Sequence, residues 1–384
     1  MKCLLISTLL VLVSCAGYQN EFTISPGGDK IEKDTLTITN YEGAIALFMP
    51  YNYEQSDALA GPELALARGV ELIRRGMLAE AEELIEREVA EGDTIRPLAE
   101  LFLNIIHDKY PDYGFSRPAV EFDEGKVNAS FPDGRAYAEV GIAGKKYIFL
   151  IDNGYSKSSI NQSIIRELGL DAAVGTLASR DLGGEESTDS LYILPEIEIG
   201  NIIVRELLIT SDRSGHQGII GWDILSQIDL RIDFAHKSIE FRRPGNSQSE
   251  KCDYFWVQTP VLYAHDCNGI PVKFIFDLGA NMTFLSDRYF DITPNEFHKV
   301  GSKTGSMKVA SGKEHEFEID IAGGVCLVLD DYIFNFSKII LSPEDFRTFT
   351  FISGGILGCD LWQSGAIRLD YRNNIFEYTH YGNE

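Results

Sequence analysis

The stretch Phe149-Leu-Ile-Asp152-Asn-Gly154 has a second version later in the chain, Phe274-Ile-Phe-Asp277-Leu-Gly279. Each version places one carboxylate after an apolar, strand-like run and before a glycine that permits a sharp turn. Downstream of the first stands Gly218-Ile-Ile-Gly221-Trp-Asp223, and downstream of the second stands Gly355-Ile-Leu-Gly358-Cys-Asp360. The same two motifs therefore occur twice, in the same order.

The repetition extends beyond these motifs. Residues 218–241 align with residues 355–378 without a gap, and seven of the 24 aligned pairs are identical. Gly144 and Gly269 each stand eight residues before their aspartate, in predicted hairpin turns. The aspartates are 125 residues apart and the glycine motifs 137 apart, so the second copy carries 12 extra residues between these landmarks. We interpret this pattern as an internal duplication.

Two homologous lobes that each offer one aspartate resemble the aspartic proteases, and the short lobes are more similar to the retropepsin type than to pepsin. The resemblance covers about residues 126 to 380. Ser158 and Thr283 agree with it, because each stands six residues after its aspartate, where this family has a hydroxyl residue. The matching residues are Asp152, Gly154, Asp277 and Gly279, with the motifs Gly218, Ile219, Ile220, Gly221 and Gly355, Ile356, Leu357, Gly358.

The resemblance implies a mostly β fold with two retropepsin-like, acid-protease-type β-barrel lobes. It also implies an aspartic-type endopeptidase, in which Asp152 and Asp277 meet at the lobe interface and share one proton. One aspartate then acts as acid while the other activates a water as base. The glycine motifs would pack beside the two Asp loops. This chemistry needs no cofactor and no metal.

Such lobes also place a flap hairpin over the site. In the first lobe the flap candidate is Ser179–Ser187, with Gly183 and Gly184 at its tip. In the second lobe its counterpart is the hairpin near Lys303 to His315, which contains Gly312. The chain departs from the family directly after each aspartate, where a Thr or Ser is usual and Asn153 and Leu278 stand instead. Asparagine can donate and accept a hydrogen bond and leucine can do neither, so at least half of a reciprocal network between the loops is missing.

Two other functions stay open at this point. Leu278 also fits a catalytically weak or inactive protease-like protein that binds a peptide between its lobes without cutting it. The helical region before the lobes fits a partner-docking protein. Fold alone does not decide between these functions and peptide hydrolysis.

The N-terminus predicts export. Lys2 precedes the apolar run Leu4 to Val13, which is too short to span a bilayer and is typical of a signal peptide over residues 1–14. Leu12-Val13-Ser14-Cys15 is similar to a bacterial lipobox, in which Cys15 would be acylated. The alternative is an ordinary signal peptide with an incidental cysteine. We expect a lipoprotein anchored in a bacterial cell envelope, on its periplasmic or surface side.

The remaining organisation follows from changes in pattern. Residues 15–58 are expected to be a lipid-anchored tether with some strand at Thr35–Thr39, and residues 59–110 a helical segment. The positions of Gly69, Gly76, Ala81 and Ile85 are similar to those of a tetratricopeptide repeat, and a helical spacer is the alternative. The lobes are expected at 118–244 and 252–384, joined by the polar linker 245–251.

Within the first lobe, consecutive hairpins over Val127–Phe131, Ala136–Ile142 and Tyr147–Ile151 are expected to deliver Asp152. A short helix is expected from Asn161 to Leu168. Two strands, Ile193–Ile199 and Ile202–Ile209, are expected after the first flap. The second lobe repeats this order.

Charge and composition limit the partners. The formal net charge of −24 disfavours nucleic acid, whose phosphates would be repelled, and the 44% hydrophobic content is enough for substantial cores. We expect a peptide or protein substrate, contact with the membrane only through the lipid anchor, and a monomer with an internal pseudo-two-fold axis. No spacing of histidines or cysteines suggests a metal site.

Four cysteines lie in the second lobe: Cys252, Cys267, Cys326 and Cys359. An exported chain permits disulfides, and three pairings of two bonds are open. Cys252 with Cys267 is the local candidate across a hairpin. The alternative is that all four are buried thiols.

Overall fold

The computed structural model describes residues 11–12, 20–26, helical positions between 62 and 103 that include all of 78–90, and most of 118–382. In that last range the description excludes 123–125, 156, 171–172, 181–185, 201, 214, 246–253, 258, 287–288, 294–297, 310–313, 342–353, 372 and 374. Several expectations fall outside the described residues: most of the signal peptide, Cys15, the strand at Thr35–Thr39, Gly76, Cys252, and the flap glycines Gly183, Gly184 and Gly312.

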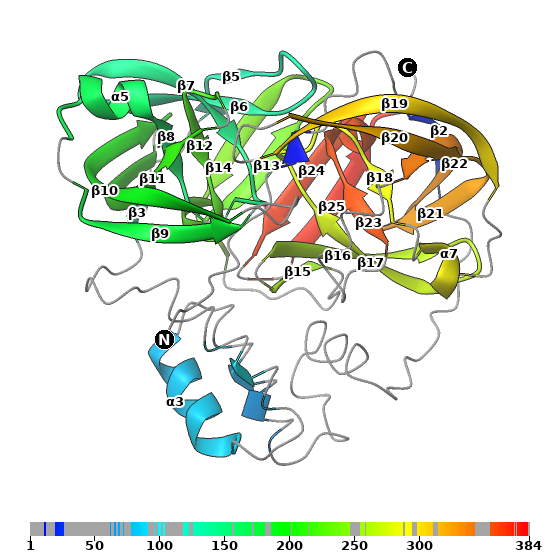
Figure 1. The fold of residues 1–384 in the computed structure, drawn as a ribbon, viewed down its shortest axis with the longest axis horizontal. Coiled ribbons are helices and arrows are strands. Elements are labelled where there is room, and N and C mark those ends of the chain that lie inside the picture. The colour runs from blue at the N-terminus through cyan, green and yellow to red at the C-terminus, as the bar shows by residue number, and fades with distance from the viewer. Residues whose placement is uncertain are drawn as a thin grey trace.

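The fold is mostly β, as predicted, and two lobes lie side by side (Figure 1). The first lobe contains β3 (Ala119–Phe122), β4 (Lys126–Val127), β5 (Ala129–Ser130), β6 (Tyr137–Ile142), β7 (Lys145–Ile151), β8 (Ser159–Asn161), α5 (Gln162–Glu167), β9 (Gly175–Arg180), β10 (Glu186–Ile199), β11 (Ile202–Asp212), β12 (Gly218–Ile220), α6 (Trp222–Leu225), β13 (Asp229–Asp233) and β14 (Ser238–Arg242).

The second lobe contains β15 (Tyr254–Val257), β16 (Thr259–Asp266), β17 (Pro271–Phe276), β18 (Phe284–Leu285), α7 (Tyr289–Ile292), β19 (Lys299–Val309), β20 (Glu314–Ala322), β21 (Val325–Leu329), β22 (Tyr332–Leu341), β23 (Gly355–Leu357), the 3₁₀ helix η3 (Cys359–Trp362), β24 (Gly365–Asp370) and β25 (Ile375–His380). The predicted linker, residues 245–251, lies almost wholly outside the described residues.

The two lobes have the same central topology. The middle of the first sheet runs β11-β8-β12-β7-β6, and the middle of the second runs β22-β18-β23-β17-β16. In both, the first and third neighbouring pairs are parallel and the other two are antiparallel. Five strands in the same order with the same directions support the internal duplication inferred from sequence.

The hairpin of β6 and β7 shows why these residues form strands. Small and β-branched side chains of β6 face the core at Ala138, Val140 and Ile142, while the residues between them are partly exposed. Ala143 and Gly144 connect the strands with φ of 50° and 76°, the left-handed pair that a tight two-residue turn requires. This hairpin ends at Asp152, as the sequence predicted.

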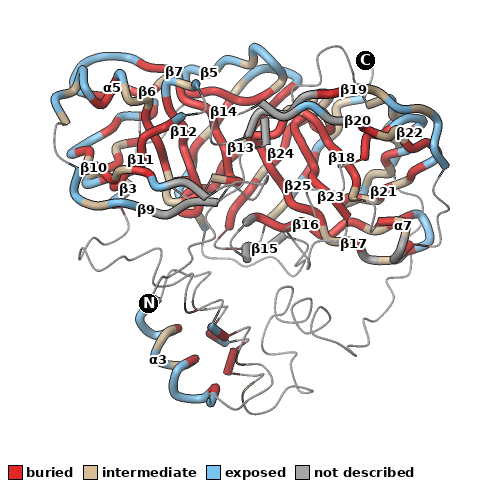
Figure 2. Tube along the Cα trace, viewed as in Figure 1, coloured by how far each residue is buried: buried red, intermediate tan, exposed pale blue. Residues whose placement is uncertain are grey.

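Buried residues follow the strands of both lobes (Figure 2). The largest fully buried side chains are Trp362, Tyr289, Phe149, Phe234, Phe241, Phe274, Phe276, Phe334 and Phe336. Each lobe therefore has enough apolar packing to fix the strand ends that carry the aspartates.

The lobes are joined by a third, five-stranded sheet in the order β25-β24-β13-β14-β4. Its central pair, β13 with β24, places Arg231 of the first lobe opposite Arg368 of the second. These two residues are equivalent in the duplicated alignment, so the pseudo-two-fold relation passes through this pair of strands. A continuous sheet fixes the lobes to each other by backbone hydrogen bonds.

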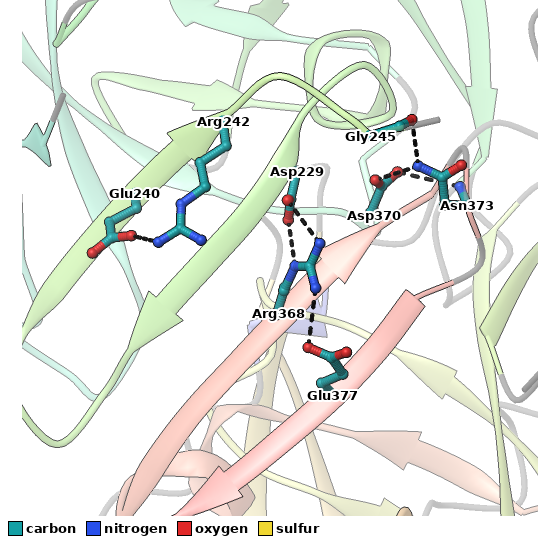
Figure 3. A network of polar contacts seen from close by, with 8 residues as sticks. All are labelled: Asp229, Glu240, Arg242, Gly245, Arg368, Asp370, Asn373 and Glu377. Atoms are coloured by element: carbon teal, nitrogen blue, oxygen red, sulfur yellow. Dashed lines mark hydrogen bonds and ion pairs between the residues drawn. The ribbon is translucent and has the colours of Figure 1, made fainter. Parts of the chain in front are cut away.

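Polar contacts reinforce this sheet (Figure 3). Arg368 donates from Nε and Nη2 to the two carboxylate oxygens of Asp229, at 2.9 and 3.0 Å, and from Nη1 to Glu377 at 3.3 Å. Asn373 donates to the carbonyl of Gly245 at 2.9 Å. The first contact is a bidentate pair between the lobes, the geometry in which Arg binds carboxylate best.

Two described stretches near the N-terminus, residues 11–12 and 21–26, pair with strands of the second lobe. The strand β2 (Glu21–Pro26) pairs antiparallel with β22, and Phe22 contacts the rings of Phe334 and Phe336, with centroids 6.1 and 5.1 Å away. The short strand β1 (Val11–Leu12) pairs with β19. Within residues 15–58, for which we expected a tether with some strand, the structure places a strand at Glu21–Pro26, whereas Thr35–Thr39 lies outside the described residues.

The helical segment contains α3 (Leu78–Glu88), which carries Ala81 and Ile85 on its buried face, followed by the buried Val89. Gly69 lies against this face, because a Cβ placed on it would stand 2.5 Å from Ile85 Cγ1. The packing agrees with two helices in contact. Among the described residues, no helix has the length and apolar character needed to cross a membrane.

The disulfide expectation was wrong in its pairing. Cys267, in the turn between β16 and β17, is bonded to Cys326 on β21, with Cα atoms 5.7 Å apart. Adjacent strands bring these two cysteines together although 59 residues separate them, whereas sequence proximity favoured Cys252. Cys359 is a free, buried thiol.

The bidentate pair between Arg368 and Asp229 gives the first prediction. Asp229→Asn removes the carboxylate from a partly buried guanidinium, so the free energy of unfolding in urea should fall by about 2 kcal/mol. Glu377→Gln is the matched control, because Glu377 is exposed and meets the same arginine through one 3.3 Å contact. It should change the free energy by less than about 0.5 kcal/mol, and equal effects of the two variants would contradict the assignment.

Candidate functional site

Each aspartate follows a strand that pairs in parallel with a glycine motif. β7 pairs with β12, and β17 pairs with β23. The Asp152 N–H donates to the Ile220 carbonyl at 3.1 Å, and the Asp277 N–H donates to the Leu357 carbonyl at 3.1 Å. Ile219 and Ile356, on the same short strands, are buried. The expectation that the glycine motifs pack beside the Asp loops agrees with this geometry.

The two carboxyl groups are close neighbours, although they come from different lobes. A Cβ placed on Gly154 would stand 3.0 Å from Asp277 Oδ1 and 3.1 Å from Asp152 Oδ1. A Cβ placed on Gly279 would stand 2.3 Å from Asp152 Oδ2. Each glycine therefore passes within reach of the opposite aspartate, and any side chain there would collide with it. Both aspartates are fully buried.

Backbone donors hold one oxygen of each carboxylate. Asp152 Oδ1 accepts from the Gly154 N–H at 2.8 Å, and Asp277 Oδ1 accepts from the N–H groups of Gly279 and Ala280 at 2.7 and 3.3 Å. The other oxygen of each, Asp152 Oδ2 and Asp277 Oδ2, is buried without a hydrogen-bond partner. Such oxygens are costly unless a proton or a bound molecule satisfies them, so they mark the point where chemistry is possible.

Burial and mutual repulsion separate the two acids. Burial raises the pKa of Asp152 well above its ordinary value, and the nearby charge of Asp277 raises it further. Burial also raises the pKa of Asp277, to about 6, against the hydrogen bonds from the Gly279 N–H, from the Asp152 carboxyl and from the Ala280 N–H. Because Asp277 has the extra backbone donor, its charged form is the better stabilised one. The pair is therefore arranged to share one proton near neutral pH.

In each lobe a hydroxyl side chain connects the Asp loop to a carboxylate and to a glycine N–H, and we call this set of hydrogen bonds the brace of that lobe. Ser158 Oγ donates to Asp223 Oδ1 at 2.7 Å and accepts from the Gly221 N–H at 3.0 Å. In the second lobe, Thr283 Oγ1 donates to Asp360 Oδ1 at 2.7 Å and accepts from the Gly358 N–H at 2.9 Å. The hydroxyls six residues after each aspartate thus tie the Asp loops to the glycine motifs.

Gly221 and Gly358 allow this close approach. A Cβ on Gly221 would stand 2.7 Å from the Tyr155 carbonyl oxygen, and one on Gly358 would stand 2.5 Å from the backbone of Met282. Both contacts are with backbone atoms that cannot move aside cheaply. A bulkier residue would displace the loop that carries the aspartate.

The residues after the aspartates make one link between the loops. Asn153 Oδ1 accepts from the Leu278 N–H at 2.7 Å, and Asn153 Nδ2 donates to the Tyr371 hydroxyl at 2.9 Å. The Leu278 side chain is fully buried and apolar, so it makes no hydrogen bond to the other loop. The Cys359 thiol donates instead to the Leu278 carbonyl at 3.3 Å. As expected, asparagine both donates and accepts, and the leucine side chain does neither.

Both predicted flap hairpins are present up to their tips. β9 pairs with β10 from Gly175↔Leu191 to Arg180↔Glu186, and β19 pairs with β20 up to Lys308↔Glu314. The tips with Gly183, Gly184 and Gly312 lie outside the described residues. Within the described part of the chain, no group of three or more His, Cys, Asp or Glu side chains could hold a metal ion.

Sequence reasoning gave no role to several residues of the site. Asp223 and Asp360 stood in the repeated motifs, and their recurrence was a signal that could have been used. Asn20, Arg135 and Tyr371 gave no signal, because none of them is repeated as the same residue in the other copy and each contacts a segment far away in the chain. Only the tertiary structure brings them to the aspartate loops.

Asn20 shows such a distant contribution. Its Nδ2 donates to Asp360 Oδ2 at 2.7 Å and to the Thr283 carbonyl at 2.8 Å, and its Oδ1 accepts from the Ile340 N–H at 3.3 Å. The equivalent oxygen in the first lobe, Asp223 Oδ2, is buried without a hydrogen-bond partner. The residue before β2 therefore satisfies the brace of one lobe only.

Comparison with known proteins finds a family model that matches part of the first lobe. Residues 138–224 match the family model described as aspartyl protease. No curated protein sequence matches the chain significantly.

Many solved structures are similar, including the following three. A retropepsin-like aspartic protease from Rickettsia conorii has 18% identity and a TM-score of 0.26, over 33% of this chain and 96% of that one. Basic 7S globulin from soybean has 9% identity and a TM-score of 0.37, over 68% and 95%. An aspartic proteinase from Irpex lacteus has 11% identity and a TM-score of 0.41, over 68% and 97%.

Asn20→Ala should destabilise the protein in a pH-dependent way. Burial raises the pKa of Asp360 to about 6, and the hydrogen bonds from Thr283 and Asn20 oppose the rise. A carboxyl whose pKa is raised on folding favours the fold at low pH, and this contribution is lost as pH rises through 6. Without Asn20 the charged form loses a donor, so we expect a loss of about 2 kcal/mol at pH 8 and a smaller one at pH 5.

Urea unfolding at the two pH values measures this difference. Glu21→Gln is the neighbouring control on β2, since Glu21 contacts only the surface residues Lys338 and Ser337. The loss of unfolding free energy in Glu21→Gln should not be larger at pH 8 than at pH 5. A loss for Asn20→Ala that is the same at both pH values would show that Asp360 is not the group it serves.

Proposed function

We propose that this chain, whose residues 138–224 carry an aspartyl protease domain, is an aspartic-type endopeptidase with Asp152 and Asp277 as its catalytic pair. The observation that carries the proposal is the juxtaposition of two fully buried carboxyl groups from homologous loops, each with one oxygen held by backbone N–H groups and one unsatisfied. A water between the unsatisfied oxygens completes the arrangement that peptide hydrolysis requires.

The chemistry follows from the different surroundings of the two acids. Asp277 has two backbone donors and is the better ionised group, so it acts as the base that takes a proton from the water. Asp152 has one such donor and holds the shared proton, so it acts as the acid. The water oxygen attacks the peptide carbonyl, a tetrahedral intermediate forms, and the leaving nitrogen is protonated as the C–N bond breaks.

The same asymmetry predicts the pH range of cleavage. Only the singly protonated pair is active, because the base must be charged and the acid neutral. Burial sets the pKa of Asp277 to about 6, so activity should fall as pH drops below about 6 and the pair gains its second proton. The pKa of Asp152 is raised well above its ordinary value, mainly by burial, so Asp152 stays protonated and active as the acid above the pKa of Asp277. Initial rates on a denatured protein across pH 3 to 9 measure this profile.

Asp152→Asn and Asp277→Asn test the pair directly. Each should lower the rate at least about 10³-fold at every pH, because one half of the acid–base pair is lost. The partly exposed carboxyl of Glu139, which pairs with Lys146 in the same lobe, offers the control Glu139→Gln, which should keep the wild-type rate. Wild-type cleavage no faster than that of either asparagine variant would end the catalytic proposal.

A second candidate, a protein that binds peptides without cutting them, is favoured by the apolar Leu278 beside the pair. Leu278→Thr, with and without Asn153→Thr, separates the two. A weakened enzyme should gain rate when the hydroxyl is supplied. A dedicated binder should hold peptides in equilibrium binding assays and show no turnover with any of these sequences.

We also propose that the protein is exported and anchored by a lipid on Cys15. The proposal is supported by the sequence Leu12-Val13-Ser14-Cys15 and by the disulfide Cys267–Cys326, since disulfides persist outside the reducing cytosol. Asn20 already contacts the second lobe, so only five chain steps separate it from Cys15. An extended chain covers at most about 18 Å in five steps, and the second lobe would therefore lie directly at the membrane surface.

Cys15→Ser tests this anchoring. Wild-type protein expressed in bacteria should partition with membranes and move to the detergent phase, and Cys15→Ser should remain in the aqueous phase. Cys359→Ser controls for loss of a cysteine as such, because that thiol is buried in the second lobe. Aqueous partition of the wild-type protein would contradict the lipid anchor and leave the proposed cleavage reaction untouched.

A further inference from the structure

A buried positive charge stands beside the aspartate pair, on one side only. Arg135 lies in the turn between β5 and β6 and is 7% exposed. Its Nη1 donates to the carbonyl oxygen of Gly279 at 3.2 Å. The contact crosses between the lobes, because Arg135 belongs to the first and Gly279 to the loop that carries Asp277.

The residue that Arg135 contacts lies between the two carboxyl groups. The Gly279 N–H donates to Asp277 Oδ1 at 2.7 Å, and the α-carbon of Gly279 passes so close to Asp152 that an added Cβ would stand 2.3 Å from Asp152 Oδ2. A guanidinium bonded to the carbonyl of this one residue is therefore near both acids. It also fixes the position of the loop that separates them.

Asp133 is the counter-ion of Arg135. Its Oδ2 accepts from Arg135 Nε at 2.9 Å and also from Nη2, and its Oδ1 accepts from the Arg135 N–H at 3.2 Å. The Tyr137 hydroxyl donates to Asp133 at 3.2 Å, and the guanidinium lies 5.7 Å from the centre of the Tyr137 ring. Burial pushes the pKa of Asp133 up, but the hydrogen bonds from Arg135 outweigh it and lower the pKa. The carboxylate therefore stays charged.

The duplication does not extend to this charge pair. The positions 125 residues later are Gln258 for Asp133 and Pro260 for Arg135. The braces with Ser158 and Thr283 recur in both lobes because both loops need them for their shape. A buried arginine with an aspartate partner that occurs in one lobe alone is not required by the shared fold, which points to a role at the site itself.

We propose that Arg135, oriented by Asp133, is a positioning residue that sets the pH range of the aspartate pair by placing a fixed positive charge at the Gly279 carbonyl. The inference rests on the proposed peptidase function and extends it. The titratable groups that face Arg135 or the pair are Asp133, Tyr137, Asp152, Tyr155, Asp277 and Cys359. None of these six groups is a base that carries a positive charge, whereas the Arg135 guanidinium is charged at every pH of the experiment.

The physical effect has a definite sign. A nearby positive charge favours the ionised carboxylate, so it moves both proton losses of the pair to lower pH. The charge of Arg135 lowers the pKa of both Asp152 and Asp277, against the larger effect of burial, which raises both. Asp133 partly cancels that charge. Removing the cation and removing its counter-ion should therefore shift the pair in opposite directions.

The experiment compares kcat/KM against pH for three variants at the site. Arg135→Gln should move both limbs of the profile to higher pH by about one unit, because the cation is lost and Asp133 remains. Asp133→Asn should move both limbs to lower pH, by a smaller amount. Arg135→Lys keeps the charge and should keep the limbs near their wild-type positions, with a lower rate because lysine lacks the planar fork.

Arg205→Gln is the control, since Arg205 is a surface arginine that pairs with Glu121 and Glu196 on the same lobe. It should leave the profile unchanged. Lower rates without displaced limbs in Arg135→Gln and Asp133→Asn would show that the pair only supports the fold. If the limbs of the pH profile moved in the same direction in Arg135→Gln and in Asp133→Asn, the proposal would also be overturned.

A second measurement does not depend on activity. The ¹³Cγ shifts of Asp152 and Asp277, assigned by comparison with Asp152→Asn and Asp277→Asn, report the titration of the pair in folded protein. The midpoints should move up in Arg135→Gln and down in Asp133→Asn. Should the wild type cleave nothing while these midpoints move as stated, the peptidase function fails and the electrostatic role of Arg135 stands. Unmoved midpoints in folded variants refute that role.

Discussion

The structure depends on keeping two carboxyl groups buried within reach of each other. Two buried carboxylates at this distance would repel each other strongly. Two neutral carboxylic acids would gain less from the backbone N–H groups that donate to them, because those donors stabilise the charged form. A single shared proton resolves this conflict. The strands that lead into Asp152 and Asp277, and the glycines that lie against the two carboxyl groups, hold these groups close enough to share a proton.

Rigid support for the pair comes from backbone rather than from side chains. Each aspartate ends a strand that runs parallel to a short glycine-containing strand, and a hydroxyl from the same loop ties the two together. The lobes themselves are connected by one continuous sheet through β13 and β24. Because hydrogen-bonded strands have little freedom to slide, the distance between the lobes is fixed where the two loops meet.

Several contacts near the aspartate pair occur in only one of the two lobes. Asn153 links the loops in one direction, and its amide reaches Tyr371 of the other lobe. Arg135 stands on one side only, and Asn20 satisfies the brace of the second lobe only. A duplicated scaffold begins with two equivalent acids, and acid–base chemistry needs two that differ. The single-copy contacts make the surroundings of the two loops different, and the second backbone donor, from Ala280, makes the two acids themselves differ.

The duplication, the mostly β fold and the hairpin before Asp152 could be predicted from the sequence, because they depend on local pattern and on repetition along the chain. The pairing of Cys267 with Cys326, the strand at Glu21–Pro26 and the contacts of Arg135 could not. Each joins segments far apart in the chain, and none has a counterpart in the other copy. The sequence by itself determined that two aspartate loops exist and resemble each other. Only the tertiary structure decided which distant side chains surround them, because those contacts arise when strands separated by tens to hundreds of residues become neighbours in one sheet.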